Sequence, residues 1–327
     1  MAASSVASVD RPFDAACWTG RSDQDDAGDT TRYHQRVSPW TGDAGAGIGL
    51  IGFACDEGVR RNGGRSGAAE GPAAIRRAFA NLAVHHGAPV YDCGDIACAG
   101  NALEAAQLRL AAAVCEIAGR TALPIVLGGG HEVAYGTWLG IVGARPGAHV
   151  LIVNFDAHFD LRADRAATSG TPFRQIAEEC SRRRTPFSYI CLGISRPSNT
   201  AALFSRAAAL DVEFWRDEEL HWQALSPVDD RLQRRIAACD GVYLTIDLDV
   251  LPGEKAPGVS APAARGVSLD IVEHLVATVV KSGKLLGADI AELNPALDRD
   301  TLTARVAARL VDGIVMAAQP PESRSER

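Results

Sequence analysis

The sequence predicts a doubly wound α/β domain, in which a mostly parallel sheet is covered by helices on both faces. Two observations predict this class. Short apolar runs alternate with helical patterns along most of the chain, and several of the runs are apolar at every position. Strands that alternate with helices build parallel sheets, and a strand buried on both faces is apolar throughout. Ligand sites of such sheets lie beyond the carboxyl ends of the strands.

Six apolar runs are predicted as strands, namely residues 46–53, 123–129, 148–155, 188–194, 242–247 and 285–293. The stretches between them repeat apolar residues with the period of a helix. The clearest helical patterns cover residues 72–82, 102–120 and 269–283. Together these elements predict a single domain over residues 46–318.

Both ends of the chain lack these patterns. The first 45 residues are rich in Asp, Ser, Thr, Gly and Arg and predict an irregular N-terminal arm. Trp18 and Trp40 are expected to pack this arm either onto the domain or against a neighbouring subunit. Residues 319–327 are predicted to form a frayed C-terminal tail.

The composition limits the classes of partner. The 327 residues carry a net charge of −7 without a basic stripe, which argues against nucleic acid. No apolar run approaches the roughly 20 residues of a membrane span, and the N-terminus lacks the pattern of a secretory signal. The eight cysteines are scattered without a C-x-x-C pair and indicate reduced, mostly buried thiols. A cytoplasmic protein with a small-molecule partner, and without membrane or nucleic-acid partners, is expected.

Histidines and acids follow three of the apolar runs. In LGGGHEVAYG the run ends at Leu127, three glycines permit a sharp turn, and His131 opens a helical pattern. The alternative is a glycine-rich strand-to-helix turn with an incidental histidine. The glycine spacing does not fit the dinucleotide-binding pattern G-x-G-x-x-G.

The segment NFDAHFDLR holds Asp156, His158 and Asp160 at every second position. Alternate side chains of an extended chain point to the same side, so these three are predicted to face one pocket. Exposed polar residues after a strand are the alternative. In YLTIDLDVLPG, Asp247 and Asp249 have the same spacing after another apolar run, with ordinary turn chemistry as the alternative.

Together the three segments bring four carboxylates and two imidazoles to one edge of one sheet. Crowded carboxylates repel and raise one another's pKa, and two divalent cations remove that repulsion. Six ligands suffice for two ions when carboxylates and a solvent molecule bridge them. Oxygen-rich ligation favours manganese over zinc, although zinc, iron, cobalt and nickel remain open. The predicted ligands of two Mn²⁺ ions per subunit are His131, Asp156, His158, Asp160, Asp247 and Asp249.

Glu292 lies near the end of another apolar run, in DIAELNPALD. Three roles are open for it: a metal ligand, a structural acid, or the partner of a cationic substrate group. A carboxylate beside a two-metal centre is placed to bind an amidinium or guanidinium through two parallel hydrogen bonds.

These motifs closely resemble those of the arginase, agmatinase and formimidoylglutamase superfamily, the ureohydrolases. GGGHE, DAHFD, DLDV and AELNP match that family's metal and substrate motifs in its order and with similar separations, from about residue 46 to residue 316. The resemblance implies a three-layer α/β/α sandwich and a two-manganese cluster, whose bridging hydroxide attacks a C–N bond of a guanidine or amidine. It also implies that the six predicted ligands bind the metals and that Glu292 holds the cationic nitrogens of the substrate. Family members form trimers and hexamers, so a homo-oligomer is expected.

The loop after DAHFD indicates which subgroup of the superfamily the chain resembles. Arginases and agmatinases carry there an additional histidine, thought to shuttle protons, whereas this chain has Ser169 at the agmatinase-like position and Phe173 at the arginase-like position. DAHFDLR with TSGTPFRQ, preceded by RRNGGRSGAAEGP, resembles the formimidoylglutamases instead. That group hydrolyses N-formimidoyl-L-glutamate to glutamate and formamide in histidine degradation.

Such a substrate carries two carboxylates and one formimidoyl cation. Anion-binding groups are therefore expected around the predicted metal ligands, at the same edge of the sheet. An arginine grips a carboxylate through two parallel hydrogen bonds; the alternative is that each arginine is a surface residue. Asp160 is predicted to carry the proton that the leaving nitrogen must gain, and Glu292 to orient the substrate. The predicted substrate-binding residues are Arg65, Arg162, Thr171, Arg174, Arg196 and Glu292.

Three other functions are weighed against this one. A guanidino-acid hydrolase, or another arginase-like or agmatinase-like enzyme, would share the metal centre and differ in the pocket. A histone-deacetylase-like amide hydrolase has a related fold but uses a single zinc. A non-catalytic member that binds a partner protein would be expected to lose metal ligands, and all six are present.

Overall fold

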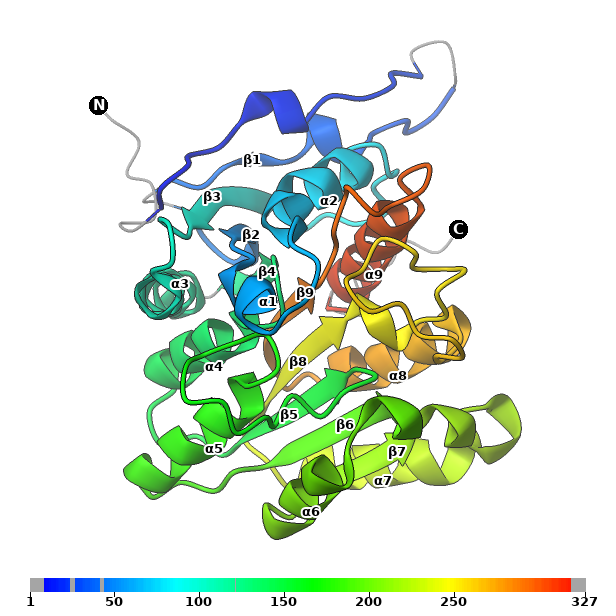
Figure 1. Ribbon diagram of the computed structural model, residues 1–327. Coiled ribbons are helices and arrows are strands. Elements are labelled where there is room, and N and C mark those ends of the chain that lie inside the picture. Colours follow the sequence, from blue (N-terminus) through cyan, green and yellow to red (C-terminus); the bar gives the residue numbers. More distant parts are fainter. Residues whose placement is uncertain (1–8, 24–26, 42–43, 121, 319–327) are drawn as a thin grey trace.

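The computed structural model describes residues 9–23, 27–41, 44–120 and 122–318. A nine-stranded sheet in which every pair of neighbours is parallel runs through these residues (Figure 1). Its strands are β1 (Ser38–Pro39), β2 (Gly47–Ala54), β3 (Val90–Ala97), β4 (Ala122–Leu127), β5 (Val150–Phe155), β6 (Tyr189–Ile194), β7 (Glu213–Arg216), β8 (Gly241–Asp247) and β9 (Leu285–Ala291). The predicted parallel α/β class is confirmed.

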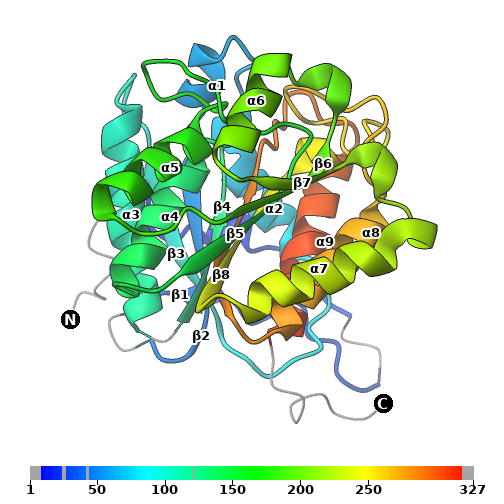
Figure 2. The same ribbon diagram turned by 90° about the horizontal axis from the view of Figure 1, so that it is seen from below.

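Helices cover both faces of the sheet and complete a three-layer sandwich. The helices are α1 (Glu57–Arg61), α2 (Gly71–Phe79), α3 (Leu103–Gly119), α4 (Val133–Ala144), α5 (Pro172–Arg183), α6 (Ala201–Ala209), α7 (Leu225–Ala237), α8 (Leu269–Lys281) and α9 (Leu302–Ala317). In Figure 2, α3, α4 and α5 lie on one side of the sheet and α2, α7, α8 and α9 on the other. Each side has its own buried apolar core, because the fully apolar strands present side chains to both faces.

The six predicted strands are all present, with ends that differ by at most two residues from the prediction. Three further strands were not predicted. β3, with the sequence VYDCGDIA, carries two acids and a glycine, and β1 and β7 have only two and four residues. β3 is nevertheless an interior strand between β1 and β2, because tertiary partners satisfy its acids.

The strand order decides where the sequence motifs meet. From one edge to the other it is β1-β3-β2-β4-β9-β8-β5-β6-β7. The four strands that precede the predicted metal and substrate residues, β4, β9, β8 and β5, are therefore consecutive in the centre of the sheet. Since all are parallel, their carboxyl ends lie at one edge, and the loops that leave them share one region of the surface.

The described part of the segment predicted as an irregular arm packs onto its own domain, while residues 1–8 of that segment lie outside the described residues. Trp18 and Trp40 are both buried, and the Trp18 indole donates a hydrogen bond of 2.8 Å to Asp92 of β3. Residues 38–39 add strand β1 to the edge of the sheet beside β3. The predicted C-terminal tail, residues 319–327, lies outside the described residues. All eight cysteines are free, and none of the described helices is long and apolar enough to span a bilayer.

A buried ion network ties α2 to β3 and supplies a stability prediction. Arg76, which is 3% exposed, bonds Asp92 at 2.8 Å and Asp95 at 2.6 Å. Replacing Arg76 with Met leaves two carboxylates without their cation, which is expected to lower the free energy of unfolding by about 3–5 kcal/mol. Arg77→Met, at an exposed position of the same helix, is the control. Equal urea denaturation midpoints for the two variants would contradict the prediction.

Candidate metal centre and active site

The site is built from the ends of four neighbouring strands. His131 follows β4, Asp156 follows β5, Asp247 ends β8, and Glu292 follows β9. The glycines before His131 let its loop run close to its neighbours: a Cβ on Gly129 would lie 1.7 Å from the carbonyl oxygen of Cys55. Only a residue without a side chain fits there, so this loop holds His131 against the adjacent strand ends.

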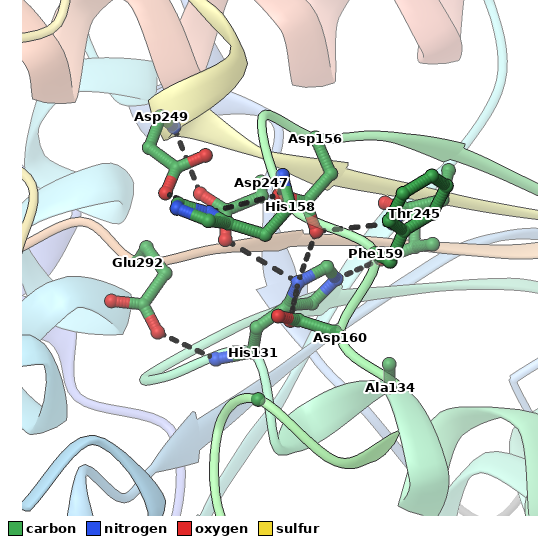
Figure 3. Close-up of polar contacts among 12 residues, drawn as sticks. His131, Ala134, Asp156, His158, Phe159, Asp160, Thr245, Asp247, Asp249 and Glu292 are labelled. Carbon is green, nitrogen blue, oxygen red and sulfur yellow. Dashed lines mark hydrogen bonds and ion pairs between the residues drawn. The ribbon is translucent and has the colours of Figure 1, made fainter. Parts of the chain in front are cut away.

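Two overlapping groups of ligand-type atoms meet at this edge (Figure 3). The Nδ1 atom of His131 lies 3.1 Å from Asp156, 2.9 Å from Asp160 and 3.3 Å from Asp247. The Nδ1 atom of His158 lies 3.1 Å from Asp249 and 3.5 Å from Asp156. Asp156 belongs to both groups, with a different carboxylate oxygen in each. That is the arrangement expected of a carboxylate that bridges two metal ions.

The side chains converge for a different reason from the one predicted. The chain is not extended from Asp156 to Asp160, because the Asp156 carboxylate accepts a 2.6 Å hydrogen bond from the backbone of His158 and Asp160 has a left-handed φ of 47°. Asp249 lies in a 3₁₀ turn, Leu248–Val250, which the Asp247 side chain caps. The two-residue period of a strand was therefore the wrong explanation, and aspartate-stabilised turns bring these ligand atoms together.

His131 has the surroundings of a metal ligand. Its Nδ1 atom is buried and lacks a hydrogen bond of good geometry, although it faces three carboxylates. Its other ring nitrogen lies 3.0 Å from the Thr245 hydroxyl, which donates a 2.5 Å hydrogen bond to Asp289. Histidines that bind metals are commonly oriented in this way through the nitrogen that does not bind the ion. The donor set therefore fits a cation placed among the carboxylates.

The electrostatics of the cluster also indicate a cation. Burial, followed by the charge of Asp156, raises the pKa of Asp160 to about 6. Burial lowers the pKa of His131, but its close contacts with three carboxylates outweigh it and raise that pKa well above its ordinary value. Burial and the charges of Asp249 and Asp156 raise the pKa of Asp247. Without a metal, these raised pKa values place extra protons on Asp160, Asp247 and His131, and a divalent cation would replace those protons.

A pH prediction follows for the metal-free protein. Burial raises the pKa of Glu292 to about 8 and that of Glu132 to about 7. A carboxyl group whose pKa is higher in the folded than in the unfolded state costs stability as the pH rises from its unfolded value, about 4.3, towards its folded value. The raised pKa of His131 acts in the same direction. Stability in the presence of a chelator is therefore expected to fall from pH 5 to pH 8. Urea denaturation across this range measures it, and constant or rising stability would be contrary evidence.

A cavity of about 370 Å³ opens onto this cluster. His158, Asp160, Asp247, Asp249 and Glu292 line it. The Glu292 carboxylate is held by a 2.9 Å hydrogen bond from the backbone of His131. A small substrate in this cavity would contact the acid predicted to bind its cationic nitrogens and the acids of both groups.

The structure separates the predicted substrate-binding residues into two sets. Arg65 and Arg162 line the cavity, whereas Thr171, Arg174 and Arg196 are not among its lining residues. The buried Thr171 hydroxyl makes hydrogen bonds with Thr168 and Gln175, its near neighbours in sequence.

Local contacts explain where the two remaining arginines lie. Arg174 bonds the carbonyl oxygens of Arg162 and Asp164, so its guanidinium holds the loop rather than facing the cavity. Arg196 lies exposed at the start of the short helix Arg196–Ser198. Position after a strand was not enough to predict orientation, because the loop's own hydrogen bonds decide it.

Several polar residues of the cavity were not predicted from the sequence. They come from the loops that follow β2, β6 and β8, at the same edge of the sheet as the metal motifs. None belongs to a metal-type cluster, and apart from that position their only signal is that Asn62 lies in RRNGGRSGAAEGP, a segment that resembles the formimidoylglutamases. These residues are Asn62, Ser198, Asn199, Thr200 and Ser260.

The fold and this edge of acids and histidines define a known class of enzyme. A model of the arginase family matches residues 46–317, and the chain belongs to that family and is a hydrolase. The chain is 52% identical over 308 residues to a formimidoylglutamase of Aeromonas hydrophila. The aligned region covers 93% of this chain and 98% of that relative. It is 53% identical to a formimidoylglutamase of Cupriavidus pinatubonensis, covering 90% of this chain and 95% of the relative.

Solved structures agree with the fold. The crystal structure of formimidoylglutamase from Bacillus subtilis superposes with a TM-score of 0.80 at 24% identity, covering 88% of this chain and 92% of that one. A crystal structure of Trypanosoma cruzi formiminoglutamase with Mn²⁺ superposes with a TM-score of 0.74 at 29% identity, covering 84% and 95% of the two chains. The resemblance to the ureohydrolases, and within them to formimidoylglutamases, is confirmed.

Proposed function

We propose that this protein hydrolyses N-formimidoyl-L-glutamate to L-glutamate and formamide, as a cytoplasmic enzyme of histidine degradation. The observation that carries the proposal is a cavity lined by members of both histidine–aspartate groups, by the acid Glu292, and by the arginines Arg65 and Arg162. Cationic and anionic partners for the two ends of one small substrate are thus present together. The relatives named formimidoylglutamase support the same substrate.

The metal centre is proposed to hold two Mn²⁺ ions. The first group of ligands would be His131, Asp156, Asp160 and Asp247, and the second Asp156, His158 and Asp249. When bound, two such ions would supply hydroxide at neutral pH and stabilise negative charge that develops on the substrate. The Trypanosoma cruzi enzyme of similar fold, solved with Mn²⁺, supports this choice of metal.

The residues of the chain would then orient the substrate and move a proton. The Glu292 carboxylate would accept hydrogen bonds from the formimidoyl nitrogens and hold the formimidoyl carbon beside the two ligand groups. Asp160 faces both the His131 ring and the cavity. It would take a proton from the attacking water and deliver it to the α-nitrogen of glutamate, which leaves as an amine when its bond to carbon breaks.

The other end of the substrate would meet the two arginines. Two of the guanidinium nitrogens of Arg65 bond the backbone carbonyls of Ser260 and Val259 at 3.0 and 2.9 Å, which fixes its position at the rim. Arg162 lies on the loop after the metal motif. A cationic diamine would be repelled here, whereas a dicarboxylate is attracted. The pocket therefore favours an acidic amidine over agmatine.

A substrate comparison tests the proposal. The protein purified with Mn²⁺ is expected to release glutamate from N-formimidoyl-L-glutamate with a far higher kcat/KM than it shows for arginine, agmatine or guanidinobutyrate. Preference for guanidinobutyrate would make it a guanidino-acid hydrolase and reject the assigned substrate, while keeping the metal centre. No activity on any of the four compounds, with two metals bound, would reject all four of these substrate assignments.

A further inference from the structure

Asn62 lines the active-site cavity, and no role was predicted for it, although it lies in RRNGGRSGAAEGP, a segment that resembles the formimidoylglutamases. It is the half-buried C-cap residue that follows α1, in the connection after β2, and it lines the cavity together with Arg162. Its Oδ1 atom accepts a 2.8 Å hydrogen bond from Nη1 of Arg162, which is 100 positions away in the sequence. The contact therefore joins two loops that meet only in the folded protein.

The chemistry of the pair determines how the Asn62 amide is turned. A guanidinium has donors and no acceptor, so the amide must present its oxygen to Arg162. The amide nitrogen, with two N–H donors, then points elsewhere. Among the residues that the structure describes, no acceptor bonds this nitrogen. Asn62 thus has donors left for a ligand in the cavity that it lines.

Arg162 is held in place from several sides. Its backbone N–H bonds the carbonyl of Gly170 at 2.8 Å, and its own carbonyl accepts a 2.7 Å hydrogen bond from Arg174. Its side chain lies on Gly170, where an added Cβ would come within 2.7 Å of the Arg162 Cδ atom. Asn62 completes this set of contacts at the guanidinium. The position of the cation is therefore determined before a substrate arrives.

We propose that Asn62 is a substrate-binding residue that selects for an acidic amidine, by donating from its amide nitrogen to the same carboxylate that Arg162 binds. This inference rests on the proposed function and names one carboxylate subsite within it. Arginine and amide would act as one clamp: Arg162 supplies charge and donors, and Asn62 fixes that charge and adds a neutral donor. A carboxylate gains from both, whereas an ammonium or guanidinium gains from neither.

Two substitutions separate binding from positioning. Asn62→Ala removes both the contact to Arg162 and the free donor. Asn62→Asp keeps an acceptor for Arg162 but replaces the donor with a negative charge. If Asn62 binds the carboxylate, both variants are expected to raise the KM for N-formimidoyl-L-glutamate about 10- to 100-fold, with Asp at least as harmful as Ala and kcat changed little. A near-normal KM for Asn62→Asp would overturn the inference, because Asn62 would then only position Arg162.

Matched controls and a second readout complete the test. Asn101→Asp, at an exposed position in the loop before α3, should leave KM unchanged, and thermal unfolding should show that all variants fold. Binding of L-glutamate to the Mn²⁺-loaded protein, followed by calorimetry, is expected to weaken in both Asn62 variants. If the wild type binds glutamate in this way but does not hydrolyse the amidine, the proposed function fails and the carboxylate subsite stands. Unchanged glutamate binding in both variants rejects the subsite whatever the substrate.

Discussion

Removing the metal ions with a chelator is expected to abolish hydrolysis of N-formimidoyl-L-glutamate and to lower the unfolding temperature at pH 8. Activity is lost because, in the proposed mechanism, the two metal ions supply the hydroxide that attacks the substrate. Stability is lost because the buried carboxylates then have no cation, and the raised pKa of Asp247 reflects that cost. An ion present at about 100 times its dissociation constant stabilises the fold by about 2.7 kcal/mol, and each bound ion would contribute a shift of this order.

Restoring single metals to the chelated protein measures both effects. Mn²⁺ is expected to return activity and the unfolding temperature together, with two ions per chain by elemental analysis. Zn²⁺, Co²⁺ and Ni²⁺, added in parallel, test the preference for manganese that the oxygen-rich ligand set predicts. Full activity in the chelated protein, with no metal found, would reject the metal centre altogether.

Replacing Asp160 with Asn is expected to lower kcat by about 10²- to 10⁴-fold, the usual contribution of general acid–base catalysis. Asn has nearly the shape of Asp but cannot take up a proton. The substitution also suits the backbone, since Asp160 has a φ of 47° and Asn is among the residues that adopt this left-handed conformation most readily. The loss would therefore report the proton carrier rather than a misfolded loop.

Metal content distinguishes a lost proton carrier from a lost metal ion in the Asp160→Asn variant. Asp160 belongs to the group around His131 and not to the group formed by Asp156, His158 and Asp249. The variant is therefore expected to keep at least the second ion. Asp164→Asn, at an exposed position of the same loop, is the matched control. A variant that retains nearly the wild-type rate would remove Asp160 from the mechanism.

The Asn62 clamp adds a point about specificity within this fold. The acids and histidines come from strand ends in the centre of the sheet, but Asn62 and Arg162 come from loops that surround them. Such loops can change without disturbing the strands. The cationic end of the substrate would thus bind to Glu292, next to a strand of the central sheet, and the anionic end would bind to residues on loops.

Much of the fold could be predicted because its signals are local. The runs that became β5 and β8 are apolar at each strand position except Asn154, Thr245 and the terminal Asp247, and both strands are buried along their whole length. β3 was missed because two acids and a glycine interrupt it. Its burial depends on Arg76 of α2, a partner that a local pattern cannot reveal.

For the site, the sequence by itself determined which residue types follow which strands, and therefore that acids and histidines would gather at one edge of a parallel sheet. It also contained the motifs by which the family is recognised. Only the tertiary structure decided which side chains face the cavity. Arg162 lines it while Arg174 turns back to hold the loop, and Asn62 enters it from a distant loop. The physical reason is that the strands and their parallel direction follow from patterns along the chain. Strand order and side-chain direction in a loop depend instead on contacts between residues far apart in sequence.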